Sequence, residues 1–386
     1  GTVLLSGANT YKGTTTVAAG TLAVSNASGL GSTNNGTTVS SGATLDLQNI
    51  TVGAETVTLN GGTLATSTGT SSLGGAIALG ANSIVNVAGT QLTLSGVISG
   101  TGLGITKSGS GTLVLSGSNT YTGGTTIGAG AVKIGNVTAL GAASSSVSLA
   151  SGAVLDLNGI TMTNTNALTL NGSGILSGGA LINSSPTGAS YAGLLTLGSA
   201  SSIIADTGAI NLANTGTISG AYTLTLGGSQ GGSIASIIGT SSGAVTKVDA
   251  GTWTLSGANT YAGGTIISAG ALVIGGSGTL GSGSYSGAIS NSGILKYSSS
   301  SDQILSGAIT GTGSLVKDAS ILSTLTLSGS NSYSGATTIA AGYVAQGAGN
   351  SLSANSDITI GSGATLNLAG YSASVASLAG AGNVVN

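Results

Sequence analysis

The segment GTLVLSGSNTYTGGTTIGAGAVKI, residues 111–134, returns three more times in this chain of 386 residues. The copies are GTVLLSGANTYKGTTTVAAGTLAV at 1–24, GTWTLSGANTYAGGTIISAGALVI at 251–274 and STLTLSGSNSYSGATTIAAGYVAQ at 323–346. A repeat of this size cannot bury its apolar side alone and must stack on copies of itself. The sequence therefore predicts a solenoid that runs as one continuous body over residues 1–386.

A second signature follows each copy at a nearly fixed distance. It reads SGATLDL from Ser41, SGAVLDL from Ser151, SGILKY from Ser292 and SGATLNL from Ser362. Its glycine lies 35, 35, 36 and 34 residues after the glycine of LSG, so the modules, near 1–49, 111–159, 251–299 and 323–370, have a constant length. The LSG glycines themselves are 110, 140 and 72 residues apart, which predicts different numbers of extra turns between modules.

Short alternating or β-branched runs within the second copy are separated by glycine-rich corners, a pattern typical of strands and turns. The runs are 112–116, 125–128 and 131–134. We expect these three short strands and their three corners to make one circuit of the chain. Alternation directs one set of side chains inward, namely Leu113, Leu115, Ile127, Val132 and Ile134, and directs Val114 and Lys133 outward.

The other copies keep this pattern with two departures. The inward positions hold Val3, Leu5, Leu22 and Val24 in the first copy, and Leu255, Leu272 and Ile274 in the third. Gln346 stands where Ile134 is expected, so the fourth coil is predicted to depart from the pattern or end early. In the second signature, the slot of Asp46 holds Asp156, Lys296 and Asn367 in the other modules. Because this slot accepts both charges and an amide, we expect it to face solvent.

Charge and cysteine are scarce, and this excludes several classes of function. The chain has six lysines, no arginine, eight acidic residues and no cysteine. Nucleic-acid binding depends on clustered Lys and Arg, whereas these lysines are spread along the chain, so that function is excluded. Disulfides and thiolate metal sites are excluded as well. The chain has no run of about 18 apolar residues, so no membrane span is predicted. No signal segment is visible, so we expect any export signal to have been removed.

The residues that catalysis needs are missing or dispersed. Histidine is absent, which removes the commonest general base and any Ser-His-Asp arrangement. Asp46 and Asp156 lie 110 residues apart, and Asp206, Asp302 and Asp318 form no tight motif of paired carboxylates. The GGSQGG run at Gly227 lacks a P-loop lysine, and the calcium repeat GGxGxD does not occur. We therefore expect no catalytic residue, no cofactor, no metal site and no enzyme activity.

Aromatic and threonine-rich positions leave two interpretations open. Tyr11, Tyr121, Tyr261 and Tyr333 recur in the SGxNxY corner, where the asparagine is expected to satisfy corner backbone groups while the tyrosine covers the turn. The alternative is that these tyrosines are exposed and hold sugars. Trp253 replaces the inward Leu113 and is expected to fill the core. Residues 14–16 suggest a flat threonine array suited to ice, but we expect its spacing to be irregular along the chain.

Four strings carry a family resemblance that covers about half of the chain clearly. They are KSGSGTLVLSGSNTYTGGTTIGAGAVKI from Lys107, LSGVISGTGLGI from Leu94, ILSGAITGTGSLVKDAS from Ile304 and SVASLAGAGNVV from Ser374. The first resembles the autotransporter-associated β-strand repeat in passenger domains of Gram-negative surface proteins. The resemblance implies an all-β, right-handed parallel β-helix that is secreted through the outer membrane and exposed at the cell surface or outside the cell. Without the family's signal and C-terminal outer-membrane domain, the chain is expected to be the passenger or a piece of it.

Two functions fit these expectations. The first is a structural, non-catalytic β-solenoid that serves as a stalk, surface layer or fibre. Exposed solenoid ends are open β-edges that template association unless capped, and neither terminus has the sequence of a cap, so end-to-end self-association is expected. The alternative is an adhesin that binds glycans or host surfaces.

Overall fold

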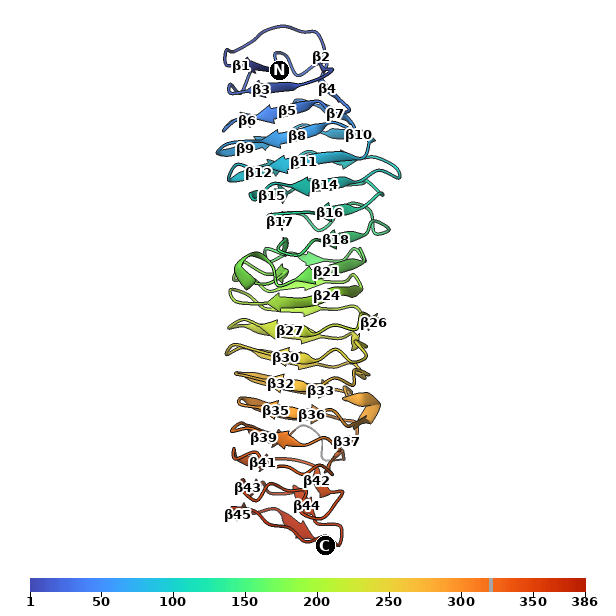
Figure 1. Ribbon diagram of the computed structural model, residues 1–386, viewed down its shortest axis with the longest axis vertical. Coiled ribbons are helices and arrows are strands. Elements are labelled where there is room, and N and C mark those ends of the chain that lie inside the picture. The colour runs from blue at the N-terminus through green and yellow to red at the C-terminus, as the bar shows by residue number, and fades with distance from the viewer. Residues whose placement is uncertain (319–321) are drawn as a thin grey trace. The chain divides into compact units, whose positions relative to one another are not determined.

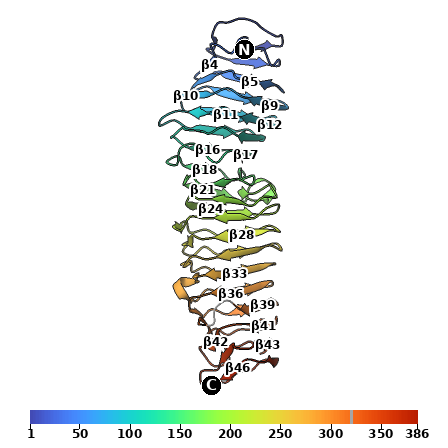
Figure 2. The same cartoon turned by 180° about the vertical axis from the view of Figure 1, so that it is seen from behind.

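The computed structural model describes residues 1–318 and 322–386. Regular structure in these ranges is β-strand, apart from two single 3₁₀ turns, η1 (Ile175–Ser177) and η2 (Gly281–Gly283). The chain forms two compact units, Gly1–Gly193 and Leu194–Asn386. Within each unit the strands of one coil pair in parallel with those of the next, so the predicted all-β parallel solenoid is confirmed. Figures 1 and 2 show these coils from opposite sides.

Three columns of strands build the first unit. Column A contains β1 (Thr2–Leu5), β3 (Thr21–Val24), β5 (Thr44–Leu47), β8 (Thr63–Thr66), β11 (Ser83–Val87), β14 (Ile105–Ser108), β16 (Thr125–Ile127), β18 (Val147–Leu149) and β21 (Leu168–Gly172). Column B contains β6 (Thr51–Val52), β9 (Thr70–Leu73), β12 (Gln91–Leu94), β15 (Thr112–Leu115), β17 (Ala131–Ile134), β19 (Val154–Asp156) and β22 (Leu181–Ile182). Column C contains β2 (Thr15–Val17), β4 (Thr37–Ser40), β7 (Val57–Asn60), β10 (Ile77–Ala81) and β13 (Ile98–Ser99), and β20 (Thr161–Met162) pairs with β23 (Ala189–Tyr191).

The second unit has the same organisation. Column D contains β24 (Leu195–Ile204), β27 (Leu224–Gly227), β30 (Val245–Lys247), β32 (Thr265–Ile267), β35 (Ile289–Asn291) and β38 (Ile309–Thr310). Column E contains β25 (Ile210–Leu212), β28 (Gly231–Ile234), β31 (Thr252–Leu255), β33 (Ala271–Gly276), β36 (Ile294–Ser299), β39 (Ser314–Lys317), β41 (Thr337–Ile339), β43 (Asp357–Ile360) and β45 (Ser377–Gly380). Column F contains β34 (Ser284–Tyr285), β37 (Gln303–Leu305), β40 (Thr324–Leu327), β42 (Tyr343–Gln346), β44 (Thr365–Asn367) and β46 (Asn383–Val385), and β26 (Thr217–Ile218) pairs with β29 (Ile237–Ile238).

The core consists of aliphatic side chains stacked in register from coil to coil. Strand alternation and parallel pairing place Leu22, Leu45 and Leu64 one above another in column A. The five residues predicted to point inward in the second copy are all fully buried, while Val114 and Lys133 are partly exposed, as expected. Each such aliphatic side chain stabilises the fold by about 1.5–3 kcal/mol relative to exposure, so stability accumulates with the number of stacked coils.

The predicted assignment of strands to coils within the module is wrong in one respect. Ala131–Ile134 pairs directly with Thr112–Leu115, residue for residue, and therefore opens the next coil instead of completing the same one. The coil of the module consists of two strands, β15 and β16, and the Asn-Tyr corner between them. Coils outside the module do have three strands, for example β8, β9 and β10. Sequence spacing alone could not separate these two arrangements.

Successive modules within a unit are displaced around the solenoid by one column. Column A contains the first and third strands of the first copy, β1 and β3, but the second strand of the second copy, β16. The same relation recurs in column E, which contains β31 and β33 of the third copy and β41 of the fourth. The repeats therefore do not line up on a single face of either unit.

The fourth copy neither breaks nor ends at Gln346. This residue is the last of β42, which pairs with β40 on one side and β44 on the other. The side chain points inward, is 2% exposed, and its Nε2 donates to the carbonyl oxygen of Ser372 at 3.1 Å. A backbone acceptor inside the coil thus allows an amide where the other copies have an aliphatic residue.

Candidate functional site

The asparagine of the SGxNxY corner joins three successive coils. Asn119 Oδ1 accepts a hydrogen bond from the backbone nitrogen of Ile98 at 2.8 Å, and its Nδ2 donates to the carbonyl oxygen of Ala139 at 2.6 Å. Asn259 and Asn331 bridge their neighbouring coils in the same way, at 2.6–3.0 Å. The expectation that this asparagine satisfies corner backbone groups is confirmed.

The corner tyrosines are part of the core. Tyr121, Tyr261 and Tyr333 are 0–1% exposed, and burial raises the pKa of each hydroxyl. Each hydroxyl shares a hydrogen bond with the threonine four residues later, at 2.5, 2.9 and 2.7 Å. The prediction that tyrosine covers the turn is confirmed, and the alternative in which these three tyrosines hold sugars is wrong. Trp253 is also buried as predicted, with its Nε1 donating to the Gly227 carbonyl at 3.0 Å.

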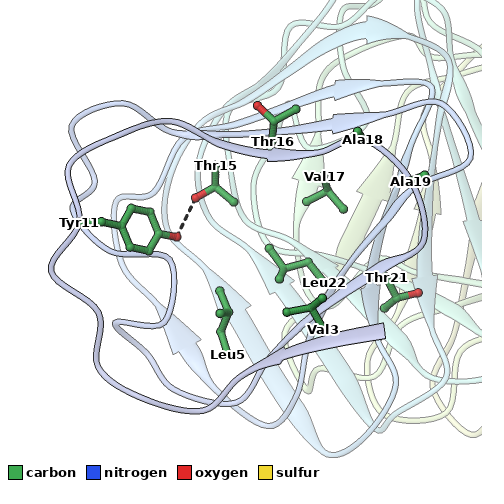
Figure 3. A pocket seen from close by; sticks show the side chains of 10 residues that line it. All are labelled: Val3, Leu5, Tyr11, Thr15, Thr16, Val17, Ala18, Ala19, Thr21 and Leu22. Carbon is green, nitrogen blue, oxygen red and sulfur yellow. Dashed lines mark hydrogen bonds between the residues drawn. The ribbon is translucent and has the colours of Figure 1, made fainter. Parts of the chain in front are cut away.

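A pocket of about 320 Å³ lies within the first coil (Figure 3). Val3, Leu5 and Leu22 line it, and Tyr11 reaches across it to Thr15, hydroxyl to hydroxyl at 2.7 Å. The matching residues of the second module, which include Leu113 and Tyr121, are fully buried. The pocket is thus the interior of the solenoid viewed through its first coil, which explains why the inward Val3 is 61% exposed. We assign no ligand to it.

Three of the lysines that are spread along the sequence occupy equivalent positions in the core. Lys107, Lys247 and Lys317 are 0–1% exposed and lie in inward stacks; Lys107, for example, is stacked between Val85 and Ile127. The Nζ of Lys107 donates to the carbonyl oxygens of Ser108, Gly109 and Ala129 at 2.9, 2.8 and 3.1 Å. We call this arrangement the carbonyl cradle.

The carbonyl cradle recurs in the later modules. Lys247 Nζ donates to the carbonyls of Val248, Asp249 and Ala269, and Lys317 Nζ donates to Ala341 at 3.5 Å. Burial lowers the pKa of Lys107 to about 8 and also lowers the pKa of Lys247 and Lys317, whose neighbouring aspartates act in the opposite direction. One sequence signal could have revealed the feature, because Lys107 and Lys247 each precede their LSG glycine by ten residues.

The position in the second signature that was expected to face solvent is covered in the two modules where an aspartate occupies it. Asp46 and Asp156 are each 5% exposed. The carboxylate of Asp46 accepts hydrogen bonds from the backbone nitrogen and hydroxyl of Ser67 at 2.8 and 2.6 Å, and Asp156 does the same with Ser184 at 3.0 and 2.6 Å. The aspartates point away from the core, as the alternation implies, but the serine of the following coil closes over them. The prediction of solvent exposure is therefore wrong for these two positions.

Among the described residues, the acidic side chains stay apart from one another. Asp206 and Asp302 each accept a backbone N–H from the next coil, and Asp318 forms an ion pair with Lys296 at 2.6 Å. Over residues 1–318 and 322–386, no group of three or more His, Cys, Asp or Glu side chains is arranged to hold a metal ion. Across the same ranges, the fold contains no helix of the length and hydrophobicity that crossing a membrane requires.

A ladder of hydroxyl side chains follows the outer face of column A. In-register pairing stacks the outward residues Thr2, Thr21, Thr44, Thr63, Ile84, Thr106, Thr126, Ser148 and Thr169. All of them are exposed or partly exposed. Column D has a similar ladder, Ser202, Thr225, Thr246, Ile266, Ser290 and Thr310. The threonine array that residues 14–16 suggested lies in column C, where pairing stacks Thr16 on Thr38, Thr58, Ala78 and Ser99, so the threonines do not continue regularly along that column, as expected.

The repeated corner and cradle can be compared with known proteins. The Passenger-associated-transport-repeat family matches residues 1–24, 105–134, 245–274 and 323–345. The chain carries the passenger-associated transport repeat. The matches at 105–134 and 245–274 include Lys107 and Lys247, so these two buried lysines lie inside the repeat. The resemblance to autotransporter passengers is thereby confirmed.

A curated relative extends the comparison to nearly the whole chain. The Adhesin BmaC autotransporter of Brucella suis biovar 1 (strain 1330) is 35% identical to it over 407 residues. The alignment covers 98% of this chain and 10% of the relative, so the chain spans about a tenth of that protein's length. No solved structure matches the chain.

Proposed function

We propose that this chain is a non-catalytic segment of the passenger of an autotransporter adhesin, displayed at the surface of a Gram-negative bacterium. One observation carries the proposal: the relative that aligns with 98% of the chain is an adhesin. In this function the solenoid contacts another surface through its outward side chains, while the repeated corners and cradles maintain the scaffold. The alternative of an adhesin is thus preferred to a purely structural stalk.

The outer faces support this proposal. The ladders of columns A and D present hydroxyl groups, which both donate and accept hydrogen bonds. The chain carries a net charge of −2 over 386 residues, so long-range attraction to a charged partner is weak. Contact through such faces depends on short-range hydrogen bonding and shape.

Adhesion by beads coated with the purified chain tests the function directly. Beads that carry the folded chain should attach to cultured epithelial cells several-fold more than beads that carry albumin, and excess soluble chain should compete. Attachment no greater than that of albumin beads would contradict the proposal. End-to-end association of the chain stays a separate prediction, which sedimentation velocity would detect as a sedimentation coefficient that rises with concentration.

A further inference from the structure

A small hollow lies beside the hydroxyl ladder of column A. It has a volume of about 140 Å³ and is lined by Asn82, Gly104, Ile105, Thr106, Gly123, Gly124 and Thr126. These residues come from three successive corners that enter β11, β14 and β16. We call this hollow the Gly104 groove. Its floor is backbone, because a side chain at Gly104 or Gly123 would lie 2.3–2.4 Å from the neighbouring coil.

Uncommitted polar groups surround the Gly104 groove. Asn82 Oδ1 accepts a hydrogen bond from the Gly104 nitrogen at 2.9 Å, which fixes the amide, and no described residue pairs with its Nδ2. Within the part of the chain that the structure describes, the hydroxyls of Thr106 and Thr126 have no hydrogen-bond partner either. Thr106 and Thr126 are paired across adjacent strands, so their side chains are about 4.8 Å apart.

The groove contains no charged side chain. Lys107, the nearest in sequence, points inward and is held in its carbonyl cradle. An acidic ligand would find no cation here, and a cationic ligand would find no carboxylate. A ligand with several closely spaced hydroxyls can instead satisfy two threonine hydroxyls and one amide together.

From this geometry we propose that the Gly104 groove binds a single ring of a neutral carbohydrate. Its volume is well below the roughly 300–1,000 Å³ of sites for larger small molecules, so it admits one ring of a longer glycan. This inference rests on the proposed adhesin function and names the class of ligand. A contact of this size binds weakly, with a dissociation constant on the order of 1 mM for the isolated ring.

The other modules supply natural substitutions at the same positions. The strand pairing of the third module places Ile266 at the position equivalent to Thr126, and that of the fourth module places Val316 at the position equivalent to Thr106. Ala244 likewise replaces Gly104, because its carbonyl accepts from Leu224 as the Gly104 carbonyl accepts from Ser83. The double variant Thr106→Val with Thr126→Ile therefore introduces only side chains that this solenoid already accommodates.

Saturation-transfer NMR on the full chain tests the groove. The probes are the methyl glycosides of glucose, galactose and mannose, with methyl glucuronoside as the acidic comparison. At least one neutral glycoside should show transfer, and the double variant should weaken its binding about tenfold, because hydrogen bonds are lost. The matched control Thr44→Val with Thr63→Val changes the same ladder away from the groove and should leave binding unchanged. Circular dichroism and melting temperature confirm that both variants are folded.

The outcomes separate the groove from the adhesin function. No transfer from any neutral glycoside, equal binding by the double variant, or preference for the glucuronoside would each overturn the groove. If wild-type beads attach to cells and double-variant beads attach equally well while the NMR signal is absent, the adhesin function survives and the groove does not. If sugar binding depends on the two threonines but wild-type beads fail to attach, the groove survives and the adhesin function does not.

Discussion

A Cβ atom on Gly329 would lie 2.3 Å from the carbonyl oxygen of Gly307, one coil below. The LSG glycines of the second and third modules have the same relation to the coil beneath them: Gly117 to Gly96 at 2.2 Å and Gly257 to Ser236 at 2.4 Å. None of these three glycines needs a left-handed backbone. The glycine of the motif therefore repeats because the coils approach too closely there for any side chain.

Replacement of Gly329 by alanine should destabilise the chain by at least about 1–3 kcal/mol, the usual cost of overpacking. Gly7 is the matched control, because it occupies the same place in the motif but a Cβ there would have no atom of another residue within 4 Å apart from its chain neighbours. Denaturant unfolding followed by circular dichroism measures both variants. Equal unfolding midpoints for Gly329→Ala and Gly7→Ala would contradict the close-approach explanation.

Replacement of Lys107 by methionine should destabilise the fold by about 1–3 kcal/mol. Methionine retains most of the buried stem but leaves three carbonyl oxygens without the ammonium donor, and buried unsatisfied acceptors are costly. Relief of the desolvated charge offsets part of this cost. Lys133→Met is the control, since Lys133 is partly exposed and should shift stability by no more than about 0.5 kcal/mol. An unchanged or higher unfolding free energy for Lys107→Met would rule out a stabilising cradle.

The same lysine should make stability rise with pH. Burial lowers the pKa of Lys107 from 10.5 to about 8, so between these values the unfolded chain binds a proton that the folded chain lacks. The free energy of unfolding therefore increases across this window. Buried tyrosines such as Tyr121, whose pKa is raised by burial, act in the opposite sense above about pH 10, the ordinary tyrosine pKa.

Denaturant unfolding of the wild type and of Lys107→Met, at pH values from about 7 to about 9.5, isolates this contribution. This range is chosen because it extends on either side of the lowered lysine pKa. The wild type should gain stability relative to the variant as pH rises. The pKa of Lys247 and that of Lys317 are lowered as well, so the free energy of unfolding of the variant still rises with pH, but less steeply. Parallel pH profiles for the two proteins would show that Lys107 keeps an ordinary pKa.

Replacement of Asn119 by alanine should cost about 2–4 kcal/mol. The side chain is 3% exposed, and its loss leaves a buried N–H of Ile98 and a carbonyl of Ala139 unsatisfied. Asn9 in the first module is the comparison, because among the described residues its side chain makes a single hydrogen bond, from Nδ2 to the carbonyl oxygen of Gly29 at 2.7 Å, and it is only partly buried. Hydrogen exchange of the Ile98 amide should accelerate in Asn119→Ala, and unchanged protection there would exclude the bridging role.

Replacement of Glu55 by glutamine should stabilise the chain at neutral pH. Glu55 is 2% exposed, its Oε1 accepts from the Thr37 hydroxyl at 2.6 Å, and no described residue contacts its Oε2 with a hydrogen bond. Burial raises the pKa of Glu55 above 4.5, so wild-type stability falls as pH rises from there through the folded-state pKa. The two proteins should unfold alike at about pH 4 and diverge above it. A glutamine variant that is less stable at pH 7 would refute a raised pKa.

Period-two alternation and the repeat itself were sufficient to predict much of the architecture. They located the inward Leu113 and Ile127 and the outward Lys133, because each depends on alternation within one strand. The corner asparagine was also predicted correctly, because its motif recurs in every module, although its partners Ile98 and Ala139 lie in the neighbouring coils. The buried Trp253 followed from its alignment with Leu113. Family resemblance added the likeness to the repeats of autotransporter passengers, and the match to the passenger-associated transport repeat confirmed that likeness.

Features that depend on the neighbouring coil were not predictable in the same way. Asp46 is buried only because Ser67, in the following coil, folds over it, and Lys107 finds an acceptor at Ala129 in the following coil. Side-chain polarity alone favoured exposure for both. The Gly104 groove was also missed, because it combines corners of three coils whose lengths the sequence does not fix.

The displacement of modules by one column limits how many repeats a flat partner can use. In the first unit, the Asn-Tyr corner follows β1 of column A in one module and β15 of column B in the next, so the two corners open toward different sides. A planar surface laid against the outside of one module therefore meets different outward side chains from those it would meet on the other module, so the two repeats do not act as two equal contacts.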